Sequence, residues 1–330
     1  MSLRFLALAV VLAGASSLLP AADSTFKIGL ICSGSTSDGG WNQLARDGVQ
    51  SLATAMGAQV SCLQKVSPDK AGDEMRSFVA DGYDLVIAHG YEFLNPAADV
   101  ASTPGKTKFA VSGADEPKPG LVSLDYDCSQ ASYQAGMLAA SLSKSGKLGF
   151  IGGEKIPSVQ SCYRGFKAGA ESISPTATVA ETYTGWDQPE KAKAQSEALI
   201  QEGVDGIYQC VDAASLGVFQ AVKEANQSQP DKPVWAFGSC ADQNGNPLCA
   251  RWMGGSVVIR LDKTFLTLAQ SVKDGTFKPG MITENLERGT CVLTINPRLI
   301  ANQTVSADLQ QKIDAAGKKL IAGQLTIASP

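Results

Sequence analysis

The first residues that could do chemistry lie in the glycine-rich stretch SDGGWNQ, which follows the apolar run FKIGLIC. Asp38 can accept a hydrogen bond from a ring N–H, Asn42 can donate and accept, and Trp41 offers an aromatic face. Three such groups around one turn suit the binding of a planar polar heterocycle by its face and its edge. The stretch therefore predicts a recognition site for a small molecule.

Two other interpretations of this stretch stay open. Trp41 opens a predicted helix, where an indole often serves only as a core residue. The pair Gly39 and Gly40 could cradle a phosphate at the start of that helix. The pair lacks the lysine of a P-loop and the spacing of a dinucleotide fingerprint, so a simple turn is favoured.

The other polar residues do not indicate a catalytic or metal centre. His89 is the only histidine, and no serine or cysteine nucleophile motif accompanies it. No two cysteines stand at a C-x-x-C spacing. We therefore expect neither an enzyme nor a cofactor or metal site, and interpret His89 as a residue at a strand end near the ligand cleft.

The cysteines instead suggest disulfides, because their number is even and the chain carries an export signal. Only eight residues separate Cys240 from Cys249, and they include turn formers, so a local disulfide is expected there. Cys32 and Cys62, on neighbouring predicted strands, form a second candidate pair. The full set is Cys32, Cys62, Cys128, Cys162, Cys210, Cys240, Cys249 and Cys291.

Composition describes an ordinary globular chain. It has 330 residues, of which 44% are hydrophobic and 18% charged, enough for about two domains. A formal net charge of −4 offers no basic field to attract nucleic acid or an anionic membrane. Polyanionic partners are therefore not expected.

Residues 1–22 resemble a signal peptide. Arg4 precedes an apolar run from Phe5 to Ala13, and small residues end the segment at Ala21 and Ala22. The apolar run is shorter than the roughly 20 residues that a membrane span needs. No cysteine lies near the expected cleavage position to carry a lipid, so we expect a cleaved, periplasmic protein.

From Phe26 onward, short apolar runs alternate with helical patterns, which predicts an α/β fold with parallel sheets covered on both faces. In the first helical stretch apolar residues recur at steps of three and four, as in Ala45, Val49 and Leu52. The alternation restarts after Asp125, which implies a second α/β lobe.

We expect the chain to cross between these lobes near 124–125, 239–243 and 284–291, and the crossings to form a hinge. The first lobe would hold residues 23–124 and 244–284. The second lobe would hold 125–243 and 285–330. Asp125 could contact ligand or only mark the first crossing.

Several segments, in order along the chain, resemble the basic membrane protein family, also called the purine nucleoside receptor type of ABC solute-binding protein. The resemblance implies a type I periplasmic binding fold, with two Rossmann-like lobes, a three-crossing hinge and a ligand between the lobes. The segments span nearly the whole chain after the signal and include SDGGWNQLARDG, GYDLVIAHGYEFLNPAADVA, SYQAGMLAASLSKSGKLGFIGGEKIPSVQSCYRGFKAGA, YTGWDQPEKAKAQSEALIQEGVDGIYQ and SVVIRLD.

The resemblance also implies which loops meet the ligand, because the crevice lies outside the carboxyl ends of the strands. The family's first binding loop matches Asp38, Trp41 and Asn42, and its second aromatic matches Trp186 most nearly. Its terminal acid–amide pair matches Asp242 and Gln243. The full set of candidate ligand-binding residues is Asp38, Trp41, Asn42, His89, Tyr91, Asp125, Trp186, Asp212, Asp242 and Gln243.

Two positions depart from the family's pattern. Cys240 stands where the family usually has an aspartate, and Ile259 stands where it often has a lysine. Both groups help to hold a purine nucleoside in members that bind one. A nucleoside, a free nucleobase or another small polar ring therefore stay open as ligands.

The resemblance implies a monomeric binding protein that delivers its ligand to the membrane permease of an ABC importer. A sensory receptor that passes occupancy to a membrane signalling partner is the alternative, because either kind of partner could recognise the same closure. An enzyme is the third and least favoured class.

Overall fold

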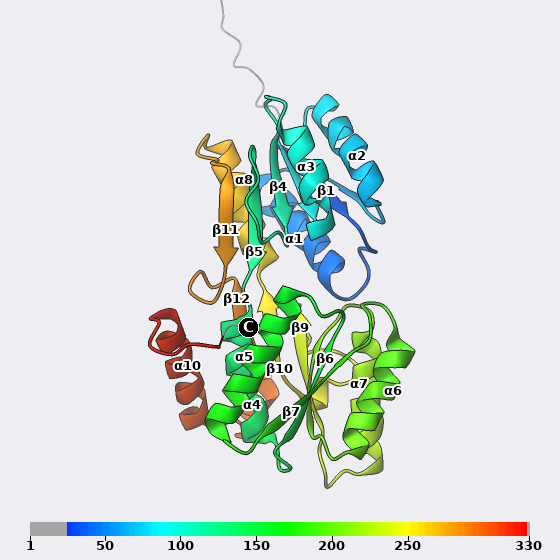
Figure 1. The fold of residues 1–330 in the computed structure, drawn as a ribbon, viewed down its shortest axis with the longest axis vertical. Helices are drawn as coiled ribbons and strands as arrows, with labels where there is room; N and C mark the ends of the chain where they lie inside the picture. The colour runs from blue at the N-terminus through cyan, green and yellow to red at the C-terminus, as the bar shows by residue number, and fades with distance from the viewer. Residues whose placement is uncertain (1–24, 329–330) are drawn as a thin grey trace, which may run out of the picture.

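The computed structural model describes residues 25–328, so the predicted signal peptide lies outside the described residues. Two α/β lobes stand one above the other (Figure 1), and each is built on a six-stranded sheet. This arrangement confirms the predicted α/β class with two Rossmann-like lobes. Within residues 25–328 no helix is long and apolar enough to cross a membrane.

The first lobe holds a fully parallel sheet with the strand order β11-β5-β4-β3-β1-β2. Its strands are β1 (Lys27–Cys32), β2 (Gln59–Leu63), β3 (Leu85–His89), β4 (Lys108–Ser112), β5 (Leu121–Tyr126) and β11 (Gly280–Glu284). Its helices are α1 (Trp41–Met56), α2 (Pro68–Ala80), η1 (Tyr91–Phe93), α3 (Leu94–Ala101) and α8 (Leu261–Lys273).

The second lobe has the order β12-β10-β9-β8-β6-β7, in which only β12 runs antiparallel to its neighbour. Its strands are β6 (Lys147–Gly152), β7 (Thr178–Tyr183), β8 (Gly206–Cys210), β9 (Trp235–Cys240), β10 (Met253–Ile259) and β12 (Cys291–Ile295). Its helices are α4 (Ser129–Leu142), α5 (Pro157–Ile173), α6 (Pro189–Gln201), α7 (Ser215–Ser228), η2 (Ala250–Trp252), α9 (Pro297–Ala301) and α10 (Ala307–Ile321).

The chain passes between the sheets after β5, after β10 and after β11. The expected crossing at 239–243 is wrong, because β9 and β10 are neighbours in the second sheet and the chain crosses at Arg260. Residues 253–259 therefore belong to the second lobe and not to the first. The reason is that every residue of β10 is buried, so this strand fits a central place between β9 and β12.

Helix α1 shows how the local pattern produced the fold. Ala45, Val49 and Leu52 are buried on one face, as their spacing predicted. The helix ends at Gly57, whose left-handed backbone (φ 65°) suits glycine. Its first turn lies at the end of β1 that faces the other lobe.

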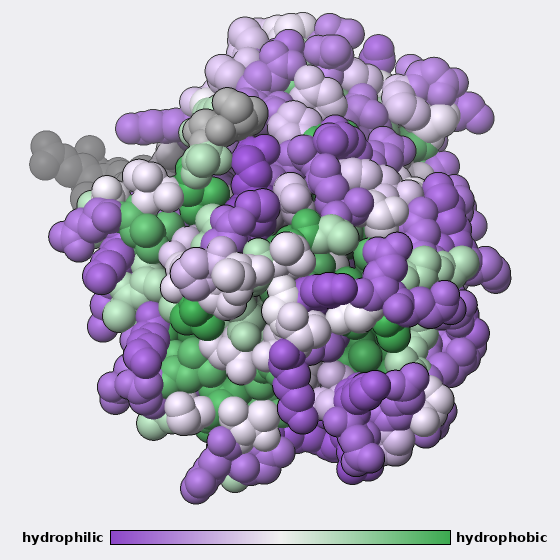
Figure 2. Space-filling model, turned by 60° about the horizontal axis from the view of Figure 1, so that its bottom comes forward, coloured by the Kyte–Doolittle hydropathy of each residue, from purple (hydrophilic) through white to green (hydrophobic). Residues whose placement is uncertain are grey.

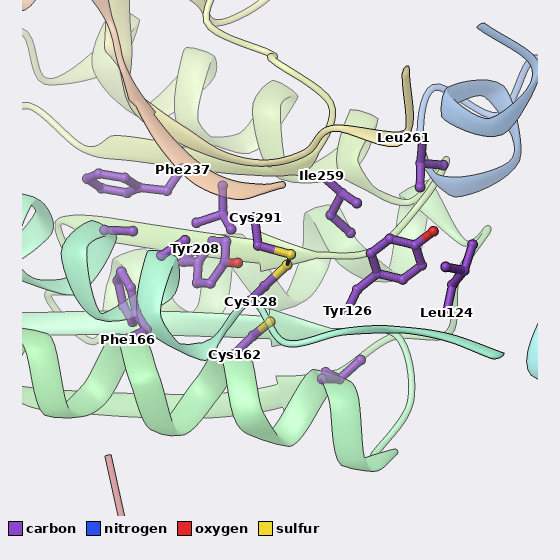
Figure 3. Close-up of a cluster of buried hydrophobic side chains, with 14 of the residues drawn as sticks. Leu124, Tyr126, Cys128, Cys162, Phe166, Tyr208, Phe237, Ile259, Leu261 and Cys291 are labelled. Atoms are coloured by element: carbon purple, nitrogen blue, oxygen red, sulfur yellow. Dashed lines mark hydrogen bonds between the residues drawn. The ribbon is translucent and has the colours of Figure 1, made fainter. Parts of the chain in front are cut away.

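One hydrophobic cluster continues from the first lobe into the second. Leu124 and Tyr126 on β5 pack with Ile259 and Leu261, which flank the crossing at Arg260 (Figure 3). Phe166, Tyr208 and Phe237 extend the same cluster into the second lobe. The crossings are therefore held by apolar burial as well as by the backbone.

Helices α4 and α5 approach so closely that glycines are required between them. A Cβ on Gly136 would lie 1.9 Å from the carbonyl oxygen of Phe166, and one on Gly169 would lie 1.9 Å from that of Tyr133. Backbone atoms cannot move aside as a flexible side chain can. Because α5 packs so closely against it, most of helix α4 is buried.

We expect Gly136→Ala to lower the free energy of unfolding by about 1 to 3 kcal/mol or more, because the added methyl group forces the helices apart. Urea denaturation followed by circular dichroism measures the change. Gly245→Ala is the matched control, since a Cβ there meets nothing within 4 Å and its backbone is not left-handed. Equal stability of the two variants would contradict the close approach of α4 and α5.

Candidate ligand-binding site between the lobes

The lobes meet where the loops at the carboxyl ends of their strands face each other. The backbone N–H of Trp41, at the start of α1, donates to Asp212 Oδ1 across the lobes at 2.9 Å. A Cβ on Gly40 would lie 2.4 Å from the same oxygen, so only glycine allows this approach. The structure is therefore closed at this point.

Asp38 precedes Gly40, the N-cap of helix α1, by two residues. Its carboxylate accepts hydrogen bonds from the backbone N–H groups of Gly40, Asn42 and Gln43, at 2.9 to 3.1 Å. Such bonds satisfy donors that have no partner inside the helix. In this closed form the carboxylate of Asp38 therefore holds the turn that presents Trp41.

Asn42 is likewise engaged within the protein. Its Nδ2 donates to Asp38 Oδ2 at 2.8 Å, and its Oδ1 accepts from the N–H of Gly34 at 3.2 Å. The residue is buried. Asn42 therefore ties the two ends of the loop together instead of facing the cleft.

The indole of Trp41 is covered on one side by His89. The two rings stack with centroids 3.9 Å apart and planes inclined by 27°. Tyr126 meets Trp41 edge-on, with centroids 5.6 Å apart. Trp41 itself is partly exposed, so the indole is supported from behind and keeps some open surface.

The hydrogen bonds of His89 fix its tautomer. The carbonyl of Trp41 can only accept, so His89 Nε2, 3.0 Å away, carries the proton. His89 Nδ1 then accepts from the Ser112 hydroxyl at 2.9 Å, and Ser112 Oγ accepts from the Tyr126 hydroxyl at 3.0 Å. Burial lowers the pKa of His89 to about 3, so this chain stays neutral at neutral pH.

His89 lies at the end of strand β3 and is engaged within the protein. Its side chain is fully buried and both ring nitrogens have protein partners. The sequence analysis also missed Ser112 and Tyr126. Ser112 ends strand β4, so its position was a usable signal, whereas nothing in the sequence pointed to Tyr126.

Asp212 is the acid that meets the first lobe. Burial raises the pKa of Asp212 to about 7, the N–H of Trp41 lowers it, and the charges of Asp38 and Asp187 raise it further. At neutral pH the carboxylate is therefore near its midpoint. Such a group can accept an N–H in its charged form or donate in its neutral form.

Trp186 lies beside the loop that carries Asp212. Its carbonyl oxygen accepts from the N–H of Ala214 at 3.0 Å. Its ring covers Gly153 so closely that a Cβ there would lie 2.2 Å from the indole. Trp186 is partly exposed, so the second lobe also presents an indole supported from behind.

Asp242 and Gln243 lie after β9. Gln243 Oε1 accepts from Gln209 Nε2 at 2.7 Å, and its backbone N–H donates to Ser256 Oγ at 3.0 Å. The exposed Asp242 accepts from the N–H of Asn244. The structure thus gives Gln243 an internal role and leaves Asp242 at the surface.

Asp242 borders a cleft of about 350 Å³ between helix α1 and the crossing that follows β10. Ile259, one of the two departures from the family pattern, also lines it. Both lobes contribute to its walls, which are formed by Leu44, Asp47, Gly48, Asp242, Val258, Ile259, Arg260, Asp262 and Thr294.

Tyr91 and Asp125 lie apart from these contacts. Tyr91 is 53% exposed, and its hydroxyl donates to Glu116 at 3.1 Å. Asp125 lies on β5 opposite Thr283 of β11, and burial raises its pKa. Asp125 lies one residue before the end of β5, where the first crossing begins. This position agrees with the interpretation of Asp125 as a residue that marks the crossing.

The disulfide expected between Cys240 and Cys249 is not formed in the structure. The two thiols pack in different hydrophobic clusters, so their side chains do not face each other. Cys32 and Cys62 lie on the paired strands β1 and β2, and the neighbouring Cys62 thiol raises the pKa of Cys32.

Two parallel α/β lobes, joined by three crossings and meeting at the carboxyl ends of their strands, define a two-lobed ligand-binding protein of the periplasmic type. Residues 25–327 match the family described as ABC transporter substrate-binding protein PnrA-like, and the chain belongs to that family. This confirms the resemblance seen in the sequence. The protein is thus a substrate-binding protein, and the family implies a small-molecule ligand and a transporter permease as partners.

Related proteins agree with this assignment. The chain is 25% identical over 308 residues to the ABC transporter nucleoside-binding protein BmpA of Lactococcus lactis, covering 88% of this chain and 86% of that protein. It is 25% identical over 272 residues to a purine-binding protein of Brucella abortus, covering 81% and 75% of the two chains. A solute-binding protein of an ABC transporter from Conexibacter woesei superimposes with a TM-score of 0.74 and 26% identity, over 92% of this chain and 99% of that one.

A more distant solved structure shows the same fold. The ABC transporter solute-binding protein from Aeropyrum pernix superimposes with a TM-score of 0.80 at 20% identity, and covers 92% of this chain and 94% of that one.

We expect closure of the lobes to depend on pH through Asp212. When the lobes open, water returns to this carboxylate and its pKa falls towards an ordinary value of about 3.9. The closed form therefore binds the proton more tightly, and its population should rise as the pH falls from about 7 towards 4. Small-angle scattering of the ligand-free protein should show a smaller radius of gyration at pH 5 than at pH 8.

Asp212→Asn is the matched control for that experiment, because the amide keeps an acceptor for the Trp41 N–H and cannot titrate. Its radius of gyration should be the same at both pH values. An equal pH response in the variant and the wild type would assign the response to another group.

Proposed function

We propose that this protein captures a small planar polar molecule between its lobes and delivers it to the permease of an ABC importer. A purine base or nucleoside is the ligand class that we favour. The names of the relatives from Lactococcus lactis and Brucella abortus support that class. The observation that carries the proposal is the hydrogen bond from the Trp41 N–H to the Asp212 carboxylate. It brings together, from opposite lobes, two residues that we expect to contact the ligand.

We further propose that Trp41 and Trp186 supply the aromatic faces of the site. Each indole has one side supported by the protein, by His89 in one case and by Gly153 in the other. Each is partly exposed and adjoins the meeting point of the lobes. A planar ring could stack on either indole when the lobes open, and closure would bury it between them.

Asp212 would accept a hydrogen bond from the edge of that ring. In the closed form it accepts an N–H from Trp41, and a ligand N–H is the same kind of donor. Asp38, Asn42 and His89 would act indirectly, by holding Trp41 in place. Asp242 would lie at the rim of the cleft, and Gln243 would support its wall.

Cys240 and Ile259 favour a ligand with few charged groups. Ile259 lines the cleft where the family often has a lysine, and Cys240 is a half-buried thiol whose pKa is raised by the loss of surrounding water. Neither can pair with a charged or strongly polar part of a ligand. A free nucleobase, which lacks the hydroxyls of a sugar, satisfies this restriction better than a nucleoside does.

We propose that the mature protein is a monomer in the periplasm. In Figure 2 hydrophilic side chains cover most of the face shown, and hydrophobic ones lie between them. The exposed large hydrophobic residues of the described chain are spread over both lobes, as in Val79, Leu216 and Ile321. A stable dimer usually buries a contiguous apolar area, which this spread does not favour.

A thermal-shift screen of nucleobases, nucleosides and sugars tests the ligand class, because a ligand that binds only the folded state raises its stability by mass action. We expect a nucleobase or nucleoside to raise Tm by several degrees at concentrations far above its Kd. A response to sugars alone would contradict the proposed class of ligand.

With that ligand, Trp41→Ala should weaken binding at least about tenfold, and Trp41→Phe much less. Loss of an aromatic pair costs roughly 0.5 to 1.5 kcal/mol beyond area burial, and an exposed polar partner costs about 1 to 3 kcal/mol more. Calorimetry measures the affinity, and circular dichroism checks the fold. Trp252→Ala, outside the proposed site, is the control and should bind as the wild type does; equal affinity in all the variants would place Trp41 in the core.

A further inference from the structure

Two cysteines lie in contact at the point where the chain enters the second lobe. The Sγ atoms of Cys128 and Cys291 are 2.8 Å apart, although 163 positions separate the residues in the sequence. Figure 3 shows their side chains pointing at each other, from the N-cap of α4 and from the first residue of β12. Cys128 follows the first crossing directly, and Cys291 follows the third.

The backbone already brings these two crossings together. Strands β5 and β11 pair in parallel up to the partners Tyr126 and Glu284. The N–H of Asp127 then donates to the carbonyl oxygen of Glu284 at 2.9 Å, beyond the last paired residues of the strands. The two segments therefore run side by side out of the first lobe, and the thiols meet where they arrive at the second.

The environment of the thiols suits a permanent bond. Cys128 is 4% exposed and Cys291 is fully buried, both within the apolar cluster that joins the lobes. The neighbouring Cys291 thiol and burial raise the pKa of Cys128 well above its ordinary value, so the folded thiol is unreactive. A bond formed before burial would then be shielded from reductants.

We propose that Cys128 and Cys291 form a disulfide that joins the first and third crossings of the hinge. A disulfide requires sulfurs about 2.05 Å apart, so these sulfurs need to approach by less than about 1 Å. The bond forms during folding, by exchange with an oxidised thiol–disulfide oxidoreductase or with oxidised glutathione.

The disulfide forms by two successive thiol–disulfide exchange steps. One cysteine thiolate attacks a sulfur of the oxidant and forms a mixed disulfide, and the second thiolate then displaces the oxidant's sulfur. The two cysteines lose two protons and two electrons in all, and the oxidant is reduced to thiols.

The bond has a mechanical consequence for closure. It would make the first and third crossings one double-stranded hinge element, cross-linked at the second lobe and hydrogen-bonded along β5 and β11 in the first. The crossing at Arg260 would stay tied to the third crossing by hydrogen bonds alone, since its N–H donates to the carbonyl oxygen of Thr290 at 2.7 Å. Opening would then rotate the lobes about the joined pair without letting its two segments slide past each other.

Other pairings of the same cysteines are alternatives that the test must separate. Cys162 lies close to Cys128 in Figure 3, and the Cys210 thiol is another neighbour, which lowers the pKa of Cys162. A bond between Cys162 and Cys210 stays within the second lobe, and one between Cys32 and Cys62 stays within the first. Only the pair Cys128 and Cys291 lies at two crossings.

The full chain is unfolded and reduced, refolded in a glutathione redox buffer, blocked with N-ethylmaleimide and digested without reductant. Mass spectrometry should find the peptide that contains Cys128 joined to the one that contains Cys291. Blocked thiols at both positions, or Cys128 joined to Cys162, would overturn the proposal.

Stability gives a second readout. Wild type refolded with the redox buffer should melt about 5 to 10 °C above wild type refolded with a phosphine reductant, because a cross-link over a long loop constrains the unfolded chain. In Cys128→Ala/Cys291→Ala most of that difference should disappear. Cys32→Ala/Cys62→Ala is the control and should keep it; the same difference in both double variants would show that Cys128 and Cys291 form no stabilising bond.

Discussion

The hydrogen bond from the Trp41 N–H to Asp212 is the contact on which the closed arrangement of the lobes depends. The first turn of a helix leaves N–H groups without partners. In α1, Asp38 satisfies those of Asn42 and Gln43, and the donor of Trp41 is left for the opposite lobe. The same turn therefore builds the first lobe's binding loop and offers the donor that Asp212 accepts, so loop geometry and lobe closure are linked.

A neutral chain of hydrogen bonds stands behind that turn. Tyr126 donates a hydrogen bond to Ser112, Ser112 donates to His89, and His89 donates to the carbonyl of Trp41. Tyr126 is also the last residue of β5 before the first crossing. The indole that we propose for ligand stacking is thus held by a strand that belongs to the hinge, which offers a physical route between movement of the crossings and the shape of the site.

The hinge itself combines two kinds of connection. The first and third crossings lie together because β5 and β11 are neighbours in one sheet, whereas the crossing at Arg260 joins β10 of one sheet to α8 on the other lobe. Ile259 and Leu261 flank Arg260 and are buried in the shared apolar cluster. Opening of the lobes has to leave this apolar cluster buried away from water. This favours rotation about the hinge over separation of the lobes.

The sequence by itself determined the local elements and the family. The three- and four-residue spacing of Ala45, Val49 and Leu52 predicted helix α1, and the order of the segments predicted two α/β lobes, because these signals depend only on neighbours in the chain. Tertiary structure decided which sheet takes β10, since an apolar strand can pair in either lobe. It also decided that Asp38 and His89 serve Trp41 and that Cys128 meets Cys291 and not a nearer cysteine. Those outcomes depend on contacts between residues far apart in sequence, for which periodicity and spacing carry no information.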